Sequence, residues 1–321
     1  MTSIFVQTGG RTELVDRVDP AWLAPDAGCV VWVDLAAPDQ TETRILSDVF
    51  RFHELAVEDA VGSLHHPKIE AYDGYLYIIL HGIAFQAAEH CFTTHDVDFF
   101  VGPSYLVSVH DGTSRSAARL REQCLQNPLV LAEGPVALLH RIVDGMVDNY
   151  RPEVDELEDR LDELEAEVFE RPYPGLLKTI VALKRDVGSL RRVTVPQRDV
   201  VGRLARREFE MVTEAVGYRF RDVYDHLVRI TEDAAVFHDH LTALLDAHLV
   251  NQSNQLSQTM KVLTVIATIF MPLTLVTGLF GMNVELPHLL GQGTIPFWSI
   301  VGGMLGISGL MLWAFRKRGW L

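Results

Sequence analysis

The sequence is poor in cysteine and in positive charge, and each shortage narrows the classes of protein that fit it. Its three cysteines, Cys29, Cys91 and Cys124, have no paired spacing. Their scatter argues against a disulfide framework and a Cys-based zinc site, and it suits a reduced compartment. Lysine and arginine total 28 against 43 aspartates and glutamates, for a formal net charge of -15. We therefore expect no nucleic acid partner.

Recognisable catalytic motifs are missing too. The chain has no nucleophile elbow, phosphate-binding loop or zincin motif, so we do not expect an enzyme. Among the 13 histidines, His65 and His66 are adjacent, and His238 and His240 are two residues apart. Neither spacing places two imidazoles on one face of a strand or helix, so no histidine metal site is predicted. The N-terminal residues also lack the pattern of a signal peptide, which predicts a cytosolic N-terminal part.

Charge is absent from two long stretches near the C-terminus. Residues 262–284 are 23 uncharged residues between Lys261 and Glu285, and as a helix they would span about 34 Å, enough to cross a bilayer. A second uncharged stretch, 295–315, is followed by the basic residues 316–318, whereas the linker between the stretches has no lysine or arginine. This asymmetry predicts two transmembrane helices in the cytoplasmic (inner) membrane, with both termini in the cytoplasm.

The sequence before these stretches divides by its hydrophobic period into two parts. Residues 1–130 predict a cytoplasmic α/β domain. Its expected elements are a buried strand at 29–35, a helix from Asp39 or Thr41 to Phe52, a helical turn at 55–61, a hairpin at 68–83 turning at Asp73-Gly74, a strand pair at 97–101 and 105–109, and a helix at 115–125.

Residues 131–200 predict an antiparallel helical hairpin, with an acidic helix at 155–169 and a second helix from Leu176 to about Val193. No proline occurs between Pro196 and Pro272, so we expect one helix from about Val212 to Phe280, with a stalk at 201–259. Apolar residues recur along it in steps of four and three, a seam that implies helical partners, most simply copies of the chain. The seam comprises Val223, Leu227, Ile230, Ala234, Phe237, Leu241, Leu244 and His248.

The first uncharged stretch contains more small and hydroxylated residues than an anchor needs. Such residues either let helices pack closely or line a wet path, and the sequence leaves both uses open. If one helical face lines a pore, from residue 257 through this stretch to residue 278, that face has no carboxylate within the membrane. Because Mg²⁺ gives up its waters reluctantly, this face would interact with a hydrated ion. Its candidate members are Ser257, Met260, Thr264, Met271, Thr274 and Gly278.

The segment 260–283, MKVLTVIATIFMPLTLVTGLFGMN, resembles the first membrane helix of the CorA family of divalent metal ion (magnesium/cobalt) transporters. The resemblance continues upstream in RDVYDH at 221–226 and, more diffusely, in residues 53–78. It implies a CorA-like funnel, a homopentamer whose stalk continues into a pore-lining helix at 260–283. An extracytoplasmic loop at 284–294, a second helix at 295–315 and a basic tail at 316–321 would follow.

The resemblance also implies roles for individual residues. Gly281, Met282 and Asn283, the family's Gly-Met-Asn signature, would form the selectivity filter. Met271 would be an apolar constriction within the pore stripe named above, and Ser257 stands where some relatives have an asparagine. Asp246 at the inner throat and Glu285 in the loop would attract cations. Regulatory Mg²⁺, which closes the channel, would be held by carboxylates of neighbouring subunits. The matching carboxylates here are Glu58, Asp59 and Asp222.

The resemblance therefore implies a channel that imports Mg²⁺, with Co²⁺ or Ni²⁺ as further cargo, and that is gated by intracellular Mg²⁺. No cofactor is expected apart from Mg²⁺ as transported and regulatory ion. The partners expected are further copies of the chain, the lipid bilayer and divalent cations. Two alternatives stay open: a zinc transporter resembling ZntB of the same superfamily, with proton coupling, and a membrane-tethered sensor or scaffold without conduction.

Overall fold

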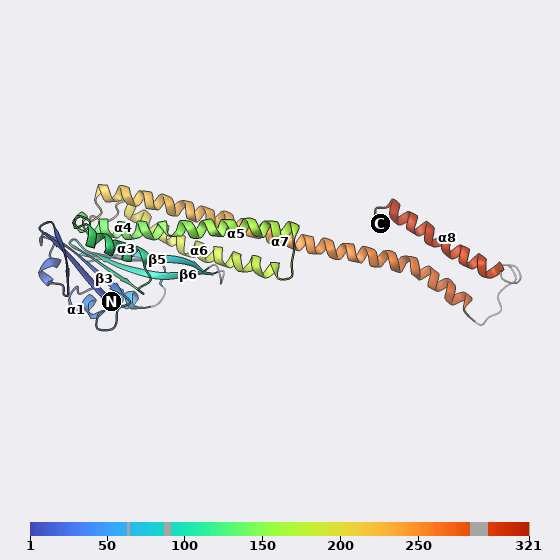
Figure 1. The fold of residues 1–321 in the computed structure, drawn as a ribbon, viewed down its shortest axis with the longest axis horizontal. Helices are drawn as coiled ribbons and strands as arrows, with labels where there is room; N and C mark the ends of the chain where they lie inside the picture. The colour runs from blue at the N-terminus through green and yellow to red at the C-terminus, as the bar shows by residue number, and fades with distance from the viewer. Residues whose placement is uncertain (63–64, 87–90, 283–294, 321) are drawn as a thin grey trace. The chain divides into compact units, whose positions relative to one another are not determined.

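The computed structural model describes residues 1–62, 65–86, 91–282 and 295–320 (Figure 1). Its contacts divide the chain into two compact units, Met1–Leu245 and Asp246–Leu321. The first unit contains a sheet with helices on both faces. The second contains the end of one long helix and the C-terminal helix.

The sheet of the first unit has seven strands in the order β2-β1-β3-β7-β6-β5-β4. Neighbouring strands are antiparallel except β3 and β7, which are parallel. The predicted strand at 29–35 and the hairpin turning at Asp73-Gly74 are present, and Gly74 has a φ of 83°, which favours glycine. The strands are β1 (Thr2–Thr8), β2 (Arg11–Val15), β3 (Cys29–Ala36), β4 (Lys68–Tyr72), β5 (Tyr75–Gln86), β6 (Cys91–Val101) and β7 (Tyr105–His110).

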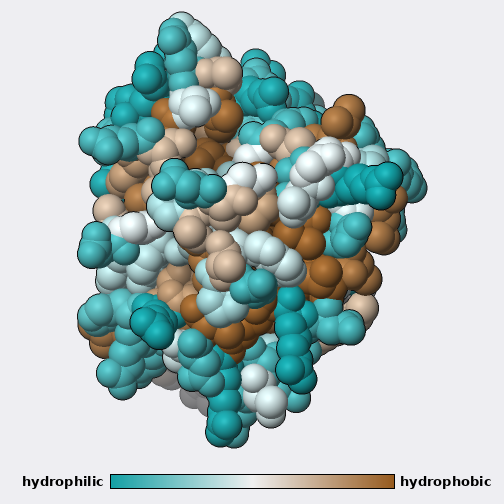
Figure 2. Space-filling model, turned by 90° about the vertical axis from the view of Figure 1, so that its left-hand side faces the viewer, coloured by the Kyte–Doolittle hydropathy of each residue, from teal (hydrophilic) through white to brown (hydrophobic). Residues whose placement is uncertain are grey.

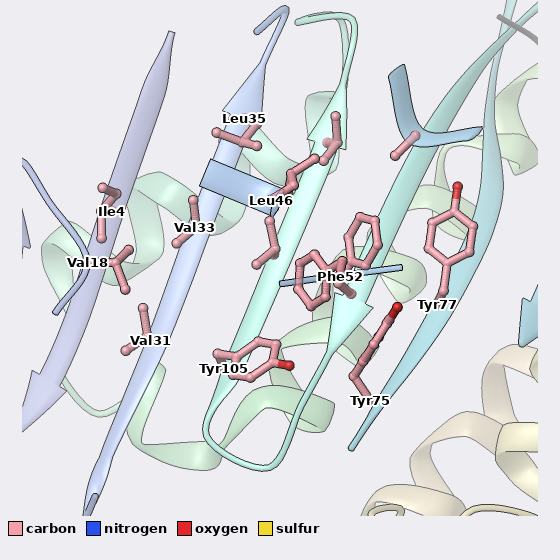
Figure 3. Packing of buried hydrophobic residues seen from close by; sticks show 14 of the residues in the cluster. Ile4, Val18, Val31, Val33, Leu35, Leu46, Phe52, Tyr75, Tyr77 and Tyr105 are labelled. Carbon is pink, nitrogen blue, oxygen red and sulfur yellow. The ribbon is translucent and has the colours of Figure 1, made fainter. Parts of the chain in front are cut away.

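Helices cover both faces of this sheet. On one face, Leu46 of α1 (Arg44–Asp48) and Ala56 of α2 (Glu54–Val61) are buried against β3, β5 and β7, as Figure 3 shows for Leu46. Phe52, which connects the two helices, stacks on Phe100 with ring centroids 4.1 Å apart. The other face carries α3 (Arg115–Gln126), α4 (Pro135–Asp148), α5 (Tyr150–Glu170) and α6 (Leu176–Ala205). Short 3₁₀ helices lie at Pro20–Leu23 and Leu131–Glu133.

Helices α1 and α6 differ most in length from the prediction. The Asp39 carboxylate accepts hydrogen bonds from the backbone N–H groups of Thr41 and Glu42, both at 2.7 Å, but α1 begins only at Arg44. It also ends early, because Arg51 has a φ of 56°, outside the helical region.

Helix α6 runs past the predicted end near Val193 and contains Pro196. It continues because the buried Gln197 is fixed from two sides. Its Oε1 accepts a hydrogen bond from the backbone N–H of His81 at 2.9 Å, and its Nε2 donates to Tyr150 Oη at 3.3 Å. The predicted border between hairpin and stalk, at residue 200, lies inside α6. The other predicted domain borders remain predictions.

The long helix is present as α7 (Glu214–Phe280), two residues from its predicted start. All eight residues of the predicted seam are buried within the single chain. In the first unit, α7 contacts the chain's own helices: His240 Nε2 lies 3.0 Å from Glu165 Oε2 of α5, and Lys184 Nζ of α6 donates to Thr242 Oγ1 at 2.8 Å. The predicted helical partners of the seam are present, but in this unit they are α5 and α6 of the same chain rather than copies of it.

The surfaces of the two units have different characters. Figure 2 shows one end of the sheet-containing unit, where hydrophilic residues surround the hydrophobic ones. In the second unit, large apolar side chains are exposed along both helices, including Phe270 and Leu275 of α7 and Leu305 and Trp313 of α8 (Ile295–Lys317). Both helices are long and apolar enough to cross a membrane. Such a surface is unfavourable in water and is satisfied by lipid or by further protein.

Candidate functional site

The residues of the predicted pore stripe are exposed on α7 in the second unit. Ser257, Met260, Thr264, Met271, Thr274 and Gly278 are all exposed in a single chain, and the Met271 side chain has 77% of its surface exposed. Their separations are multiples of about three and a half residues, which keeps them on one side of a helix.

A different face of α7 is covered. Val265 is 5% exposed, and half-buried positions follow it at 268, 269, 272, 273 and 276. On α8, half-buried positions recur at 300, 301, 304, 308, 311, 314 and 315. Both helices belong to one compact unit, and on each helix the half-buried positions recur at helical spacing along one side. The residues of the pore stripe lie on another side of α7 and are exposed.

The stripe threonines use their hydroxyl protons on the helix itself. Thr264 Oγ1 donates to the carbonyl oxygen of Met260 at 2.7 Å, and Thr274 Oγ1 donates to that of Phe270 at 2.9 Å. A hydroxyl that has spent its proton in this way presents only its acceptor lone pairs. Acceptors are what the water molecules around a cation require. Thr268 and Thr277 bond to the backbone in the same way, so it is the face of the helix that distinguishes Thr264 and Thr274.

At the end of α7 the chain needs a residue without a side chain. The Gly281 N–H donates to the carbonyl oxygen of Thr277 at 2.8 Å, and a Cβ on Gly281 would lie 2.8 Å from the same oxygen. Met282 follows with 59% of its surface exposed. Asn283 and Glu285, the remaining predicted filter and loop residues, lie outside the described residues.

Asp246 is exposed on α7 and belongs to a longer acidic series that we had not predicted. Asp225, Glu232 and Asp239 precede it at intervals of seven residues, and all four side chains are exposed. None of the four forms an ion pair with another residue that the structure describes. Seven-residue spacing places them on nearly one face of the helix, opposite the buried seam. The same spacing is visible in the sequence and could have revealed this acidic ladder.

The predicted regulatory carboxylates are not gathered within one chain. Glu58 and Asp222 are exposed, on α2 and α7 respectively, whereas Asp59 is engaged. Asp59 Oδ2 lies 2.7 Å from Lys68 Nζ, and its Oδ1 lies 3.6 Å from His65 Nε2. The described part of the chain holds no group of three or more histidine, cysteine, aspartate or glutamate side chains arranged around a metal ion. Carboxylates from a second copy would be needed to complete a site.

The sheet beneath α2 also contains buried ionisable groups that sequence reasoning missed. The Tyr77 hydroxyl donates to Asp98 Oδ1 at 2.6 Å. Burial raises the pKa of Asp98 to about 7, although this hydrogen bond acts in the opposite direction. Asp96 Oδ1 lies 2.8 Å from His81 Nδ1, and its Oδ2 accepts from the backbone N–H of His65 at 2.9 Å. This second contact ties the segment that follows α2 to the sheet.

A third buried carboxylate, Asp34, is fully partnered. It accepts hydrogen bonds from Ser108 Oγ at 2.7 Å and from Arg121 Nη2 at 2.9 Å, and it lies 3.1 Å from His110 Nε2. Burial alone would raise the pKa of Asp34, but the hydrogen bonds and charges of these partners hold it below its usual value. These contacts join β3, β7 and α3, so this cluster stabilises the sheet domain.

Comparison with known proteins identifies the family. A model of the CorA-like Mg²⁺ transporter protein family matches residues 28–317. The cobalt/magnesium transport protein CorA of Thermotoga maritima is 30% identical over 299 residues, which cover 92% of this chain and 85% of that protein. The zinc transport protein ZntB of Photorhabdus laumondii is 31% identical over 197 residues, but these cover only 57% of this chain.

The fold agrees over the full length. The solved structure of the CorA magnesium transporter from Methanocaldococcus jannaschii superposes with a TM-score of 0.86, covering 100% of this chain and 99% of that one, at 21% sequence identity. The sheet domain, the long helix and the two candidate membrane helices are therefore those of the CorA fold. With the family model spanning most of its length and a CorA relative matching nearly all of it, this chain belongs to the CorA-like Mg²⁺ transporter family.

Proposed function

We propose that the chain transports divalent metal cations, Mg²⁺ first and Co²⁺ or Ni²⁺ as further cargo, across the cytoplasmic membrane. The observation that carries this proposal is the free face of α7. Its hydroxyl and methionine side chains are exposed while the helix packs elsewhere. A helix that served only as an anchor would have no need of hydroxyl oxygens on its uncovered face.

A path for ions requires several copies of the chain. Two membrane helices cannot enclose a pore, but copies arranged around an axis bring one stripe from each subunit to the centre. The family resemblance favours five copies, a homopentamer embedded in the bilayer. The exposed apolar residues of α7 and α8 would then face lipid and neighbouring subunits. The basic residues 316–318 favour an orientation with both termini in the cytoplasm.

The ion would pass with its waters attached. Thr264 and Thr274 would accept hydrogen bonds from those waters, and a ring of Asn283 amides would do the same at the outer entrance. Met271 would form an apolar constriction that closes by excluding water. Ser257, Met260 and Gly278 would complete the wall, with Gly281 and Met282 leading into the filter. No step in this path breaks or forms a covalent bond, and no enzymatic reaction is proposed.

Negative charge would concentrate cations on either side of the membrane. Glu285 would act outside the filter and Asp246 at the inner throat. The acidic ladder of Asp225, Glu232 and Asp239 would extend the inner attraction along the stalk. Carboxylates with like charge at short range raise the local cation concentration and make transport sensitive to ionic strength.

Glu58, Asp59 and Asp222 are proposed to sense intracellular Mg²⁺. They fit the ion in donor type, since Mg²⁺ prefers carboxylate oxygens and retained water, and Glu58 and Asp222 are exposed to meet a neighbouring subunit. Bound Mg²⁺ would supply the positive charge that holds facing carboxylates together. At low Mg²⁺ the same carboxylates would repel one another, and the assembly would open.

The experiment that tests the proposal is ion uptake into proteoliposomes, with Mg²⁺ or Zn²⁺ and with or without a pH gradient. Mg²⁺ uptake that is indifferent to pH and abolished by Asn283→Ala in an assembled protein is the expected result. Zn²⁺ uptake that follows the proton gradient would instead support a ZntB-like transporter, the second candidate, which the partial match to that protein favours. No uptake of either ion would support a sensor or scaffold.

A further inference from the structure

One of the three proposed regulatory carboxylates already holds a cation from its own chain. Lys68 Nζ lies 2.7 Å from Asp59 Oδ2 and 3.1 Å from Glu70 Oε1. Glu58 and Asp222 form no ion pair with any residue that the structure describes. Asp59 therefore differs from them, because its charge is balanced before any metal ion arrives.

The position of Lys68 is fixed by the sheet. Lys68 and Glu70 lie two residues apart on β4, so their side chains leave the same face of the sheet, the face that α2 covers. Lys68 Nζ also lies 5.5 Å from the centre of the Tyr77 ring on β5, a cation–π contact. The Lys68 and Asp59 side chains are 32% and 28% exposed. A pair that is two-thirds covered is less screened by solvent than a surface pair.

We propose that Lys68 is a built-in competitor of the regulatory divalent ion and sets the concentration at which that ion binds. To coordinate Asp59 Oδ2, a divalent ion must displace the Lys68 ammonium or bind beside its positive charge. Either route weakens binding. This inference rests on the proposed regulatory role of Asp59.

Glu70 is a second hydrogen-bond acceptor for Lys68 when Asp59 is no longer available. If Asp59 turns to a metal ion, Lys68 keeps its hydrogen bond to Glu70, so its charge is not left buried without a partner. Glu70 therefore favours release, while Lys68 itself opposes metal binding. Loss of the two side chains should shift metal affinity in opposite directions, whereas general damage to α2 or β4 would shift it in one direction.

The test uses the full-length protein in detergent and measures protection from protease as Mg²⁺ is raised, a reading independent of transport. Lys68→Gln keeps a hydrogen-bond donor without the charge, and it should lower the Mg²⁺ midpoint by on the order of fivefold, the scale of a partly screened ion pair. Glu70→Gln should raise the midpoint. Arg160→Gln removes another cation held between two carboxylates, Glu163 and Glu167 on α5, and should leave the midpoint unchanged.

The variant Asp59→Asn distinguishes the regulatory role of Asp59 from the competitor role of Lys68. If this variant loses Mg²⁺ protection while Lys68→Gln keeps the wild-type midpoint, the competitor role is overturned and the regulatory site stands. If Asp59→Asn is protected as well as wild type, both fail together. Opposite shifts for Lys68→Gln and Glu70→Gln, with Arg160→Gln unchanged, establish Lys68 as the competitor.

Discussion

Replacing Asp98 by asparagine should make the protein more stable at neutral and alkaline pH. Asp98 is 4% exposed on β6, and its Oδ1 accepts a hydrogen bond from the Tyr77 hydroxyl at 2.6 Å. Burial raises the pKa of this carboxyl from 3.8 to about 7. The folded protein therefore holds the proton more tightly than the unfolded chain between those two values. An asparagine keeps an oxygen that can accept the Tyr77 hydrogen bond but has no proton to lose.

The sign and size follow from this difference. Because the folded-state pKa is the higher one, stability falls as pH rises from about 4 to about 7, by about 1.4 kcal/mol per pH unit, and then levels off. The whole effect is about 4 kcal/mol, an upper bound because a buried carboxylate draws in water. Asp98→Asn should remove this fall.

The loss of stability with rising pH would be measured by thermal unfolding of the purified protein between pH 4 and pH 9. The quantity to compare is the difference in stability between wild type and Asp98→Asn. The difference cancels the other titrating groups, including Asp34, whose pKa is shifted the other way. Equal slopes for the two proteins, or a variant that is less stable than wild type above pH 7, would refute the reasoning.

Three further changes test the path and the fold. Thr274→Val should lower Mg²⁺ uptake by about fivefold, from about 1 kcal/mol per lost hydrogen bond, whereas Thr277→Val, off the stripe, should leave uptake unchanged. Neutralising the acidic ladder with Glu232→Gln and Asp239→Asn should slow uptake at low ionic strength, and the difference should vanish in high salt. Gln197→Ala should destabilise the sheet domain by about 1–3 kcal/mol in a denaturation assay, because it leaves the buried His81 N–H without its acceptor.

The elements that could be predicted from the sequence are those whose signal is long and local. The α7 helix has 67 residues, with an apolar period and few helix breakers, so its limits were predicted within two residues. The hairpin of β4 and β5 was predicted from Asp73-Gly74, because a tight turn needs a glycine-tolerant backbone. Strands β1 and β2 were missed, although they form a local hairpin that turns at Gly9-Gly10, whose φ values are positive. Only the pairing of β1 with β3 is a contact between more distant parts of the sequence.

The sequence did not predict which helices pack together or which charged side chains form ion pairs. The period of the α7 seam showed that one face is buried, but a period does not name its partner, and α5 and α6 fill that place in the first unit. Likewise, Asp59 and Lys68 are nine residues apart, and only the fold of α2 over β4 brings their charges to 2.7 Å. The second helix was predicted to end near Val193, whereas α6 continues to Ala205, and Gln197 in this extension contacts His81 and Tyr150 of distant elements. In each case the deciding interaction is tertiary.

The chemistry along the free face of α7 changes where the surroundings change. Carboxylates recur every seven residues up to Asp246, and beyond Lys261 the helix has no charged residue before its end at Phe280. In water, separated carboxylates attract cations without trapping them, since solvent screens each charge. Within a membrane, a ring of carboxylates would hold a divalent ion more strongly than neutral oxygens do, and conduction needs sites that the ion can leave. Under the proposed function, neutral oxygens such as those of Thr264 and Thr274 would meet that need, so α7 would gather ions in its acidic part and pass them on in its uncharged part.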